Sequence, residues 1–126
     1  MKWSIQQLNK FFNRDHNFEA TFDFSEYIKN IDDIVSIKYS KVNGLIHVLD
    51  FNKFRFDLHI DTVLVLEDAV TLEPVDFHIE VDCVEHFATE DDGNEDLNII
   101  NTNTLDLEPI VWEIILLEKP IRYTKE

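Results

Sequence analysis

The segment Phe54-Arg55-Phe56-Asp57-Leu58-His59-Ile60-Asp61 alternates between apolar and polar side chains without a break. Successive side chains of a β-strand point to opposite faces, so this pattern predicts a strand with one buried and one solvated face. The same pattern returns after the connection 67–74, at Val75, Phe77, Ile79, Val81 and Cys83. Because sequential strands usually pair, the two segments are expected to be antiparallel neighbours.

Segments on the N-terminal side of this pair predict more strands. Residues 18–24 alternate strictly and residues 34–42 alternate imperfectly. Asn43-Gly44 is a dipeptide typical of a tight hairpin, with 45–49 as the returning strand. Residues 62–66 are apolar on both faces, as expected for a central strand. Together these segments predict an antiparallel meander.

The first part of the chain is expected to contain short helices. Ile5, Leu8 and Phe12 have helical spacing and Ser4 is a suitable N-cap, although a short strand at 2–5 fits equally well. Ser25 is a second N-cap candidate, ahead of a short helix over residues 26–31.

The last element has the strongest helical pattern. Its apolar positions lie on one broad face: Ile110, Val111, Trp112, Ile114, Ile115, Leu116 and Leu117. Pro109 suits the first turn, Pro120 marks the end, and Thr104 or Asp106 can cap the start. An apolar surface this broad must be packed, and the sheet is its expected neighbour.

The chain of 126 residues is 44% hydrophobic, which suits one domain with one core. We expect a single α+β domain over residues 1–126. It should contain an antiparallel meander of about five or six strands, with a C-terminal helix packed on it and a short helix near the N-terminus. Residues 89–103 are rich in acidic and polar side chains, so they are expected to form a mobile acidic loop.

Acidic side chains outnumber basic ones by 26 to 11, which gives a formal net charge of -15. Surfaces that bind nucleic acid neutralise phosphates with Lys and Arg, so direct RNA contact is disfavoured. Opposite charges steer encounter, and a basic protein is therefore the expected partner. Simple solubility explains the charge equally well, and an acidic decoy that mimics nucleic acid is a further alternative.

The residue types that covalent or phosphate chemistry requires are not arranged in a known pattern. With only two glycines the chain has no phosphate loop or dinucleotide turn, and it has no Gly-x-Ser-x-Gly elbow. The lone Cys83 shares the parity of the apolar residues around it, so its thiol is expected in the core, where it is inert. We therefore expect no catalytic residue, no cofactor and no enzymatic activity.

The chain has no charged and then apolar leader, and its longest apolar window is interrupted by Glu113. A membrane-spanning helix needs roughly 18 or more apolar residues in a row. A cytoplasmic protein without membrane contact is expected.

A metal-dependent hydrolase is the alternative from another class. Two strands carry His and carboxylate side chains on their polar faces: Asp57, His59 and Asp61 on one, and His78, Glu80 and Asp82 on the other. If these strands pair, the side chains could converge on Zn, Mn or non-haem Fe. A solvated strand face shows the same alternation, so we predict no metal ligand.

A Leu-Glu-Pro core occurs twice, in Thr71-Leu72-Glu73-Pro74-Val75 and in Thr104-Leu105-Asp106-Leu107-Glu108-Pro109. A proline at these positions suits the start of a strand at Pro74 and the first turn of a helix at Pro109. Each copy therefore has an ordinary structural explanation, and the two do not indicate an internal repeat.

Taken in order, several segments resemble the bacterial YceD/YlbN family, the large ribosomal RNA accumulation proteins. The similar segments are Met1-Lys2-Trp3-Ser4-Ile5-Gln6-Gln7-Leu8, Phe24-Ser25-Glu26-Tyr27, Phe56-Asp57-Leu58-His59-Ile60, Leu64-Val65-Leu66, Thr71-Leu72-Glu73-Pro74-Val75-Asp76, Asp106-Leu107-Glu108-Pro109-Ile110-Val111-Trp112-Glu113 and Leu116-Leu117-Glu118-Lys119-Pro120. The resemblance covers essentially the whole chain. Many relatives have a cysteine shortly before Leu-Glu-Pro, where this chain has Asp68-Ala69-Val70.

The resemblance implies a non-enzymatic role in the synthesis, processing or accumulation of 23S rRNA during assembly of the large ribosomal subunit. The implied partner is a basic ribosomal or assembly protein of that subunit. The resemblance carries over no catalytic residue. The motif residues Leu72, Glu73, Asp106 and Glu108 are the predicted partner-binding positions.

Overall fold

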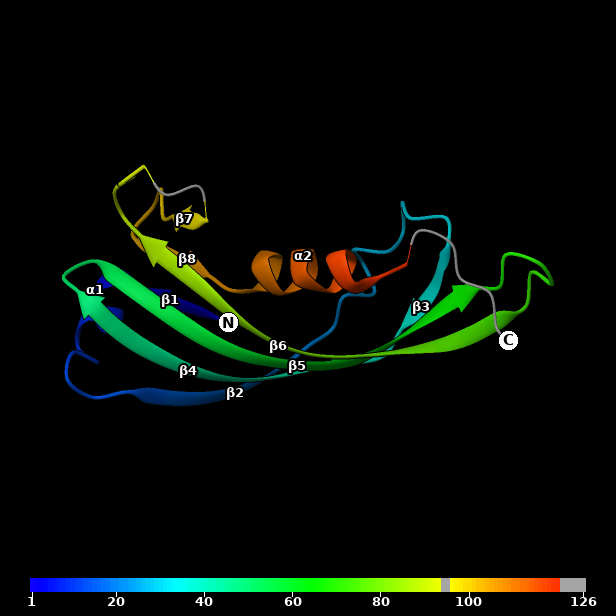
Figure 1. Cartoon of the computed structure of the whole chain (residues 1–126), viewed down its shortest axis with the longest axis horizontal. Coiled ribbons are helices and arrows are strands. Elements are labelled where there is room, and N and C mark those ends of the chain that lie inside the picture. The colour runs from blue at the N-terminus through cyan, green and yellow to red at the C-terminus, as the bar shows by residue number, and fades with distance from the viewer. Residues whose placement is uncertain (94–95, 121–126) are drawn as a thin grey trace.

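The computed structural model describes residues 1–93 and 96–120. Its elements are, in chain order, β1 (Lys2–Ser4), α1 (Ile5–Asn9), β2 (His16–Phe22), β3 (Ile34–Ile37), β4 (Ser40–Asp50), β5 (Lys53–Glu67), β6 (Pro74–Ala88), β7 (Leu97–Ile99), β8 (Thr104–Asp106) and α2 (Glu108–Glu118). A long curved sheet forms one layer, and α2 lies across its concave side (Figure 1). The predicted α+β class, the short N-terminal helix and the C-terminal helix are confirmed.

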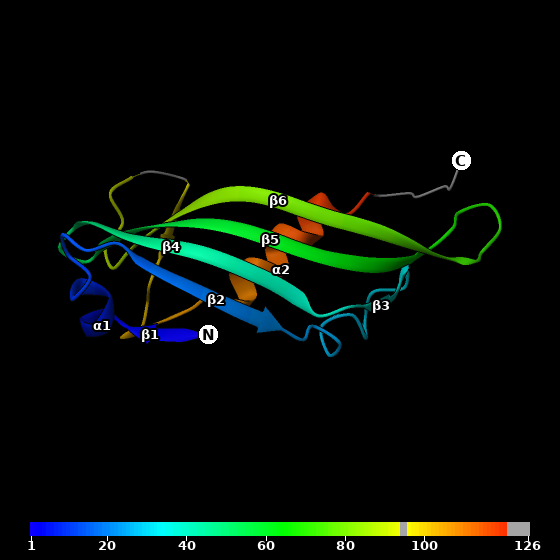
Figure 2. The same cartoon turned by 90° about the horizontal axis from the view of Figure 1, so that it is seen from below.

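Over the described residues the main sheet has six strands, in the order β2-β4-β5-β6-β7 with β3 also paired to β5. The segments β4, β5 and β6 form the predicted antiparallel meander, and β5 and β6 pair along their whole length. The last strand, β7, runs parallel to the end of β6. In Figure 2, β2 and β6 border the sheet on opposite sides.

The predicted parity of β5 is confirmed by burial. Phe54, Phe56 and Ile60 are fully buried, whereas the intervening polar residues are partly exposed. A separate two-stranded ladder sets Trp3 of β1 opposite Leu105 of β8. The Trp3 ring packs edge-on against Phe56, with 5.4 Å between ring centroids. The strands β1 and β8, which are far apart in the sequence, therefore contribute Trp3 and Leu105 to one hydrophobic core with Phe56.

The predicted hairpin at Asn43-Gly44 is wrong, because both residues lie inside the uninterrupted strand β4. The turn comes later, at Phe51-Asn52, where Asn52 adopts a φ of 61°. Gly44 has a packing role. A Cβ at this position would lie 2.2 Å from two ring carbons of Phe18 on the neighbouring strand. The glycine therefore makes room for an aromatic ring, and a tertiary contact overrides the local turn preference.

The segment 34–42, expected as one strand, is divided between β3 and β4. The central strand β5 changes partner at this break, because Asp61 faces β4 and Leu64 faces β3. A buried hydrogen bond marks the junction, in which the Ser40 hydroxyl donates to Thr62 Oγ1 at 2.9 Å. The buried hydroxyls of Ser40 and Thr62 therefore satisfy each other where β5 changes its partner strand.

Two further predictions need correction. Residues 25–30 form successive turns and not a capped helix, because Tyr27 N donates to Phe24 O across a three-residue span. The acidic segment 89–103, expected to be a loop, contains the short strand β7. Part of that segment, residues 94–95, lies outside the described residues.

Helix α2 packs on the sheet as predicted and buries Val111, Trp112, Ile114 and Ile115. Leu117 was expected on the same face, but it is 84% exposed. The helix begins at Glu108, so Pro109 does lie in the first turn, and Thr104 lies in β8 and does not cap the helix. Within the described ranges, no helix is both long enough and apolar enough to cross a bilayer.

Candidate functional site

The convex face of the sheet, opposite α2, is seen from below in Figure 2. Histidine and carboxylate side chains of neighbouring strands meet on this face. The β5–β6 register sets His59 opposite Asp82, and Asp61 opposite Glu80. The polar positions of the two alternating segments therefore lie side by side on the same face of the sheet. We call this side of the sheet the open face.

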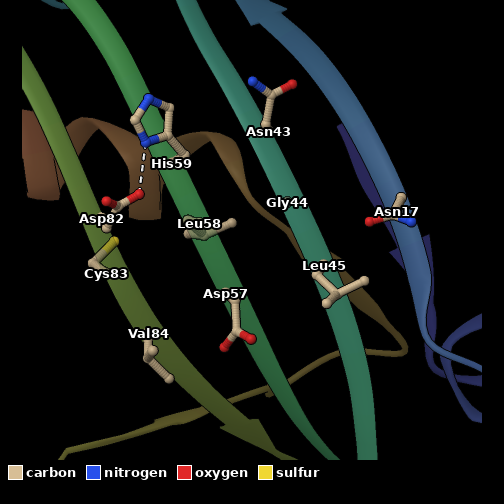
Figure 3. Close-up of a pocket in the computed structure, with 10 residues that line it drawn as sticks. All are labelled: Asn17, Asn43, Gly44, Leu45, Asp57, Leu58, His59, Asp82, Cys83 and Val84. Carbon is tan, nitrogen blue, oxygen red and sulfur yellow. Dashed lines mark hydrogen bonds and ion pairs between the residues drawn. The ribbon is translucent and has the colours of Figure 1, made fainter.

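His59 binds a carboxylate through each of its ring nitrogens. Nδ1 lies 2.6 Å from Asp82 Oδ1, as Figure 3 shows, and Nε2 lies 3.1 Å from Glu80 Oε2. Two carboxylate acceptors favour the imidazolium, in which both nitrogens donate. The hydrogen bond to Asp82 therefore raises the pKa of His59 above 6.5. The charge of Asp82 and the contacts with Glu80 add to the effect, and desolvation opposes it.

Two more histidines on the open face have carboxylate partners. His78 Nε2 lies 2.6 Å from Asp61 Oδ1. His47 lies between two carboxylates, 3.0 Å from Asp15 Oδ1 and 2.8 Å from Asp57 Oδ2. Each of these contacts joins residues on different segments of the chain, so polar side chains of this face link neighbouring strands.

A shallow hollow of about 410 Å³ lies beside His59 on this side (Figure 3). Its rim includes Asn17 and Asn43 from β2 and β4, and Asp57 from β5. The histidines and carboxylates were also the candidate metal ligands. Among the described residues, however, no group of three or more His, Cys, Asp or Glu is arranged to hold a metal ion. The imidazoles of His47, His59 and His78 have carboxylates as hydrogen-bond partners, so these residues give the hydrolase alternative no support.

Cys83 is half-buried and packs against the core, as its sequence parity predicts. Burial raises the pKa of its thiol to about 11, and the charges of Glu85, Asp82 and Glu118 add to the effect. The thiolate, which is the reactive form, is therefore scarce near neutral pH.

The predicted partner-binding residues Leu72 and Glu73 lie in the tight loop between β5 and β6. Asp68, itself only 2% exposed, accepts hydrogen bonds through Oδ1 from the backbone N–H of Val70 at 2.8 Å and of Thr71 at 3.0 Å. Two backbone hydrogen bonds close the loop, from Leu72 N to Asp68 O at 2.9 Å and from Asp68 N to Glu73 O at 2.8 Å. The buried carboxylate thus organises the loop from inside.

This loop presents apolar side chains to water. Val70 is 68% exposed and Leu72 is 66% exposed. Leu72 also has a φ of 63°, in the left-handed region that residues other than Gly rarely occupy. A strained backbone that holds an exposed leucine is the kind of feature found at recognition sites.

The other two predicted residues, Asp106 and Glu108, lie at the start of α2. Asp106 Oδ1 accepts a hydrogen bond from Glu108 N at 3.2 Å, so its carboxylate ties the first turn. Glu108 Oε2 accepts a hydrogen bond from the Tyr27 hydroxyl at 2.9 Å. Burial, aided by this contact, raises the pKa of Tyr27. Both carboxylates therefore have structural partners here.

The structure does not bring the two pairs of predicted residues together. The loop with Leu72 and Glu73 lies beyond one end of β5 and β6, whereas Asp106 ends β8 and Glu108 begins α2, which lies over the sheet (Figure 1). A single docking surface that uses all four residues is not supported by this arrangement.

Sequence reasoning missed an apolar hollow of about 420 Å³ at the other end of the sheet, lined by Asn9, Phe12, Val48, Asp50 and Phe51. Phe12 is 57% exposed and Phe51 is 74% exposed. Asn9 fixes their relative position, since its amide donates to Asn52 Oδ1 at 2.8 Å and its Oδ1 accepts from Asn52 N at 3.1 Å. The available signal was Phe51, an aromatic residue in a polar turn.

Comparison with curated proteins finds the uncharacterized protein YlbN of Bacillus subtilis (strain 168). It is 32% identical over 125 residues, which span 97% of this chain and 72% of that protein. The chain belongs to the YlbN family. No protein-family profile matches it. No solved structure matches it either.

Within this YlbN family member, the segments that carried the resemblance divide into two groups. Trp3 and Trp112 are core residues, and the second Leu-Glu-Pro segment joins β8 to α2. The first Leu-Glu-Pro segment is different, because Leu72 and Glu73 are exposed and only Pro74 belongs to a strand. That first segment is therefore the part of the motif that can meet another molecule.

Proposed function

We propose that this protein is a non-enzymatic factor that supports 23S rRNA synthesis, processing or accumulation during assembly of the large ribosomal subunit. It acts by binding a basic ribosomal or assembly protein and does not contact RNA directly. The observation that carries the proposal is the similarity to YlbN over nearly the whole chain. Because the similarity spans 97% of the chain and is not confined to one motif, it supports the family membership on which the implied role rests.

The charge distribution supports a basic protein as the partner. The net charge of -15 repels phosphate, and the carboxylates of the open face are ordered by their histidine partners. Ordered charges of one sign steer a partner of the opposite sign and slow encounters with others. The loop around Leu72 adds the apolar contact that a charged surface alone does not provide.

The chemistry of the described side chains supports a role without catalysis. The thiol of Cys83 has a raised pKa, and the imidazole of His59 has both nitrogens engaged by carboxylates. A general base needs a free nitrogen near a substrate, and a nucleophile needs an activated form.

The test compares a bacterial strain lacking this gene with the same strain supplied with the wild-type gene. We expect a lower ratio of 23S to 16S rRNA in the deletion strain and restoration by the wild type. Affinity purification from the restored strain should recover a basic protein of the large subunit or of its assembly. A normal rRNA ratio in the deletion strain, with no such protein recovered, would refute the proposal.

A further inference from the structure

Among residues 1–93 and 96–120, no strand pairs with most of the outer border of β6, which is a long row of backbone groups. Along its inner side, β6 pairs with β5 over the whole span Pro74–Ala88. On the outer side, the short strand β7 pairs only with His86, Phe87 and Ala88. In the part of the chain that the structure describes, no strand pairs with the outer side of β6 before His86. In Figure 2, β6 runs along the margin of the sheet.

The register shows which residues point their backbone outward. In an antiparallel ladder, directly opposed residues alternate between pairs that exchange hydrogen bonds and pairs that do not. Asp68 N donates to Glu73 O, so alternate residues of β6 counted from Glu73 bond to β5. A second contact gives the same register. Val63 O accepts a hydrogen bond from Lys38 N, so the backbone of Val63 points away from β6. His78, which lies opposite Val63 in β6, therefore makes no backbone hydrogen bond to β5.

Alternate residues of β6 therefore direct both N–H and C=O away from the sheet: Asp76, His78, Glu80, Asp82 and Val84. We call this row the β6 edge. Pro74 occupies the preceding outward position and has no N–H to offer, so the row of donors begins at Asp76. A row of this length to which no described residue adds a strand is a template for another strand.

We propose that the β6 edge binds an extended, basic segment of a partner protein by strand addition. The inference rests on the proposed function in one respect, since it specifies how the expected basic partner would be held. Main-chain hydrogen bonds provide the affinity in this mode of recognition, and alternate side chains provide the specificity.

The two sides of the β6 edge define the sequence of the occupant. On the open face, Asp76, Glu80 and Asp82 are exposed, so side chains pointing there should be Lys or Arg. On the helix side, Val81 and Cys83 are only partly buried, and Glu118 near the end of α2 is close enough to act on the Cys83 thiol. Side chains pointing there should be apolar. The occupant is therefore a strand in which basic and apolar residues alternate.

A second copy of this chain is disfavoured at the same place. Pairing two β6 edges would set the carboxylates of Asp76, Glu80 and Asp82 near those of the partner copy. Like charges opposite each other destabilise a pair of strands, and natural edges use them against self-association. The acidic side chains thus admit a basic strand and reject the protein's own edge.

The probe is a short blocked peptide in which lysine alternates with valine, and the control peptide has the same composition with its lysines grouped at one end. Binding of the alternating peptide should slow amide hydrogen exchange at Asp76, His78, Glu80, Asp82 and Val84. The grouped peptide should bind more weakly. No binding of the alternating peptide, or protection confined to the loop or to the hollow beside Phe51, would overturn the inference.

A matched pair of variants separates strand addition from charge alone. Val84 is 53% exposed and its N–H points outward, so Val84→Pro removes an outward donor while the ladder to β5 keeps its hydrogen bonds. Val84→Thr keeps the N–H and the β-branched shape. We expect Val84→Pro to weaken peptide binding about tenfold and Val84→Thr to leave it nearly unchanged.

The outcomes are separable from those of the rRNA experiment. Equal binding by the two Val84 variants overturns strand addition even if 23S rRNA falls in the deletion strain. Loss of peptide binding in Val84→Pro but not in Val84→Thr supports strand addition even if the 23S rRNA level is normal in the deletion strain. If Val84→Pro fails to fold, the exchange pattern of the wild type with the peptide gives the answer on its own.

Discussion

Replacing Leu72 separates the strain in the β5–β6 loop from the contact that its side chain makes with a partner. Leu72→Ala removes an exposed side chain and keeps the left-handed backbone, whereas Leu72→Gly removes both the side chain and the strain. The left-handed conformation costs a non-glycine residue about 1–2 kcal/mol. Relief of this strain in Leu72→Gly is partly offset, by about 0.5–1 kcal/mol, because glycine gives the unfolded chain more conformational freedom. Leu72→Gly should therefore be the more stable variant, by about 0.5–1 kcal/mol.

Loss of the Leu72 side-chain contacts should lower the free energy of unfolding by about the same amount in both variants. Leu72 is 66% exposed, so only about a third of the 1.5–3 kcal/mol for full burial of a leucine is lost, or about 0.5–1 kcal/mol. Urea unfolding of the wild type and both variants measures the differences directly. A Leu72→Ala protein as stable as Leu72→Gly would refute the strain argument.

The same two variants test the docking role. If the loop binds the partner through Leu72, both variants should remain folded and both should lose partner recovery and 23S rRNA support in the complemented strain. Folded variants that restore 23S rRNA fully would show that Leu72 does not contact the partner. Loss of function in Leu72→Ala alone would trace the effect to stability, since only that variant keeps the strain.

Three other predictions address packing, electrostatics and thiol chemistry. Gly44→Ala should destabilise the protein by about 1–3 kcal/mol in urea unfolding, and Phe18→Leu should suppress the effect, because the added Cβ meets the Phe18 ring. Asp82→Asn should lower the pKa of His59 toward 6.5 in an NMR titration, since the Asp82 carboxylate is the main cause of its elevation; an unchanged pKa would contradict the observed contact. Cys83 should react slowly with a thiol reagent near neutral pH and rapidly only after unfolding, and fast labelling of the native protein would contradict its half-buried position.

Periodicity predicted those parts of the fold in which side-chain parity alone sets the structure. The alternation around Phe56 and Ile79 identified β5 and β6 and their buried faces, because burial of one face imposes a period of two. The partner of His59 also follows from counting outward from the connection between these strands. The carboxylate contacts of His59 and His78 across the β5–β6 pair were for this reason accessible to sequence reasoning, whereas those of His47 were not.

Prediction failed where a distant contact set the local structure. Asn43-Gly44 has the composition of a hairpin, but the ring of Phe18 requires the glycine in mid-strand. The left-handed Leu72 depends on the buried carboxylate of Asp68, and no pattern in the sequence shows that this aspartate points inward. Local composition does not show which ring or carboxylate from a distant part of the sequence will contact a given segment.

The loop at Leu72 and the β6 edge are consecutive parts of one surface, which makes their tests interdependent. The loop ends at Glu73, Pro74 closes the row of outward donors, and Asp76 provides the first of them. A strand added along β6 from Val84 toward Asp76 would therefore finish beside the exposed leucine. If one partner uses both features, Val84→Pro and Leu72→Gly should each weaken the same complex. The double variant should then lose less binding free energy than the sum of the two single losses, because a partner segment already released by one substitution has no further contact to lose at the other. Fully additive losses would indicate two contacts that bind without regard to each other, and a loss in only one variant would assign the partner to that feature alone.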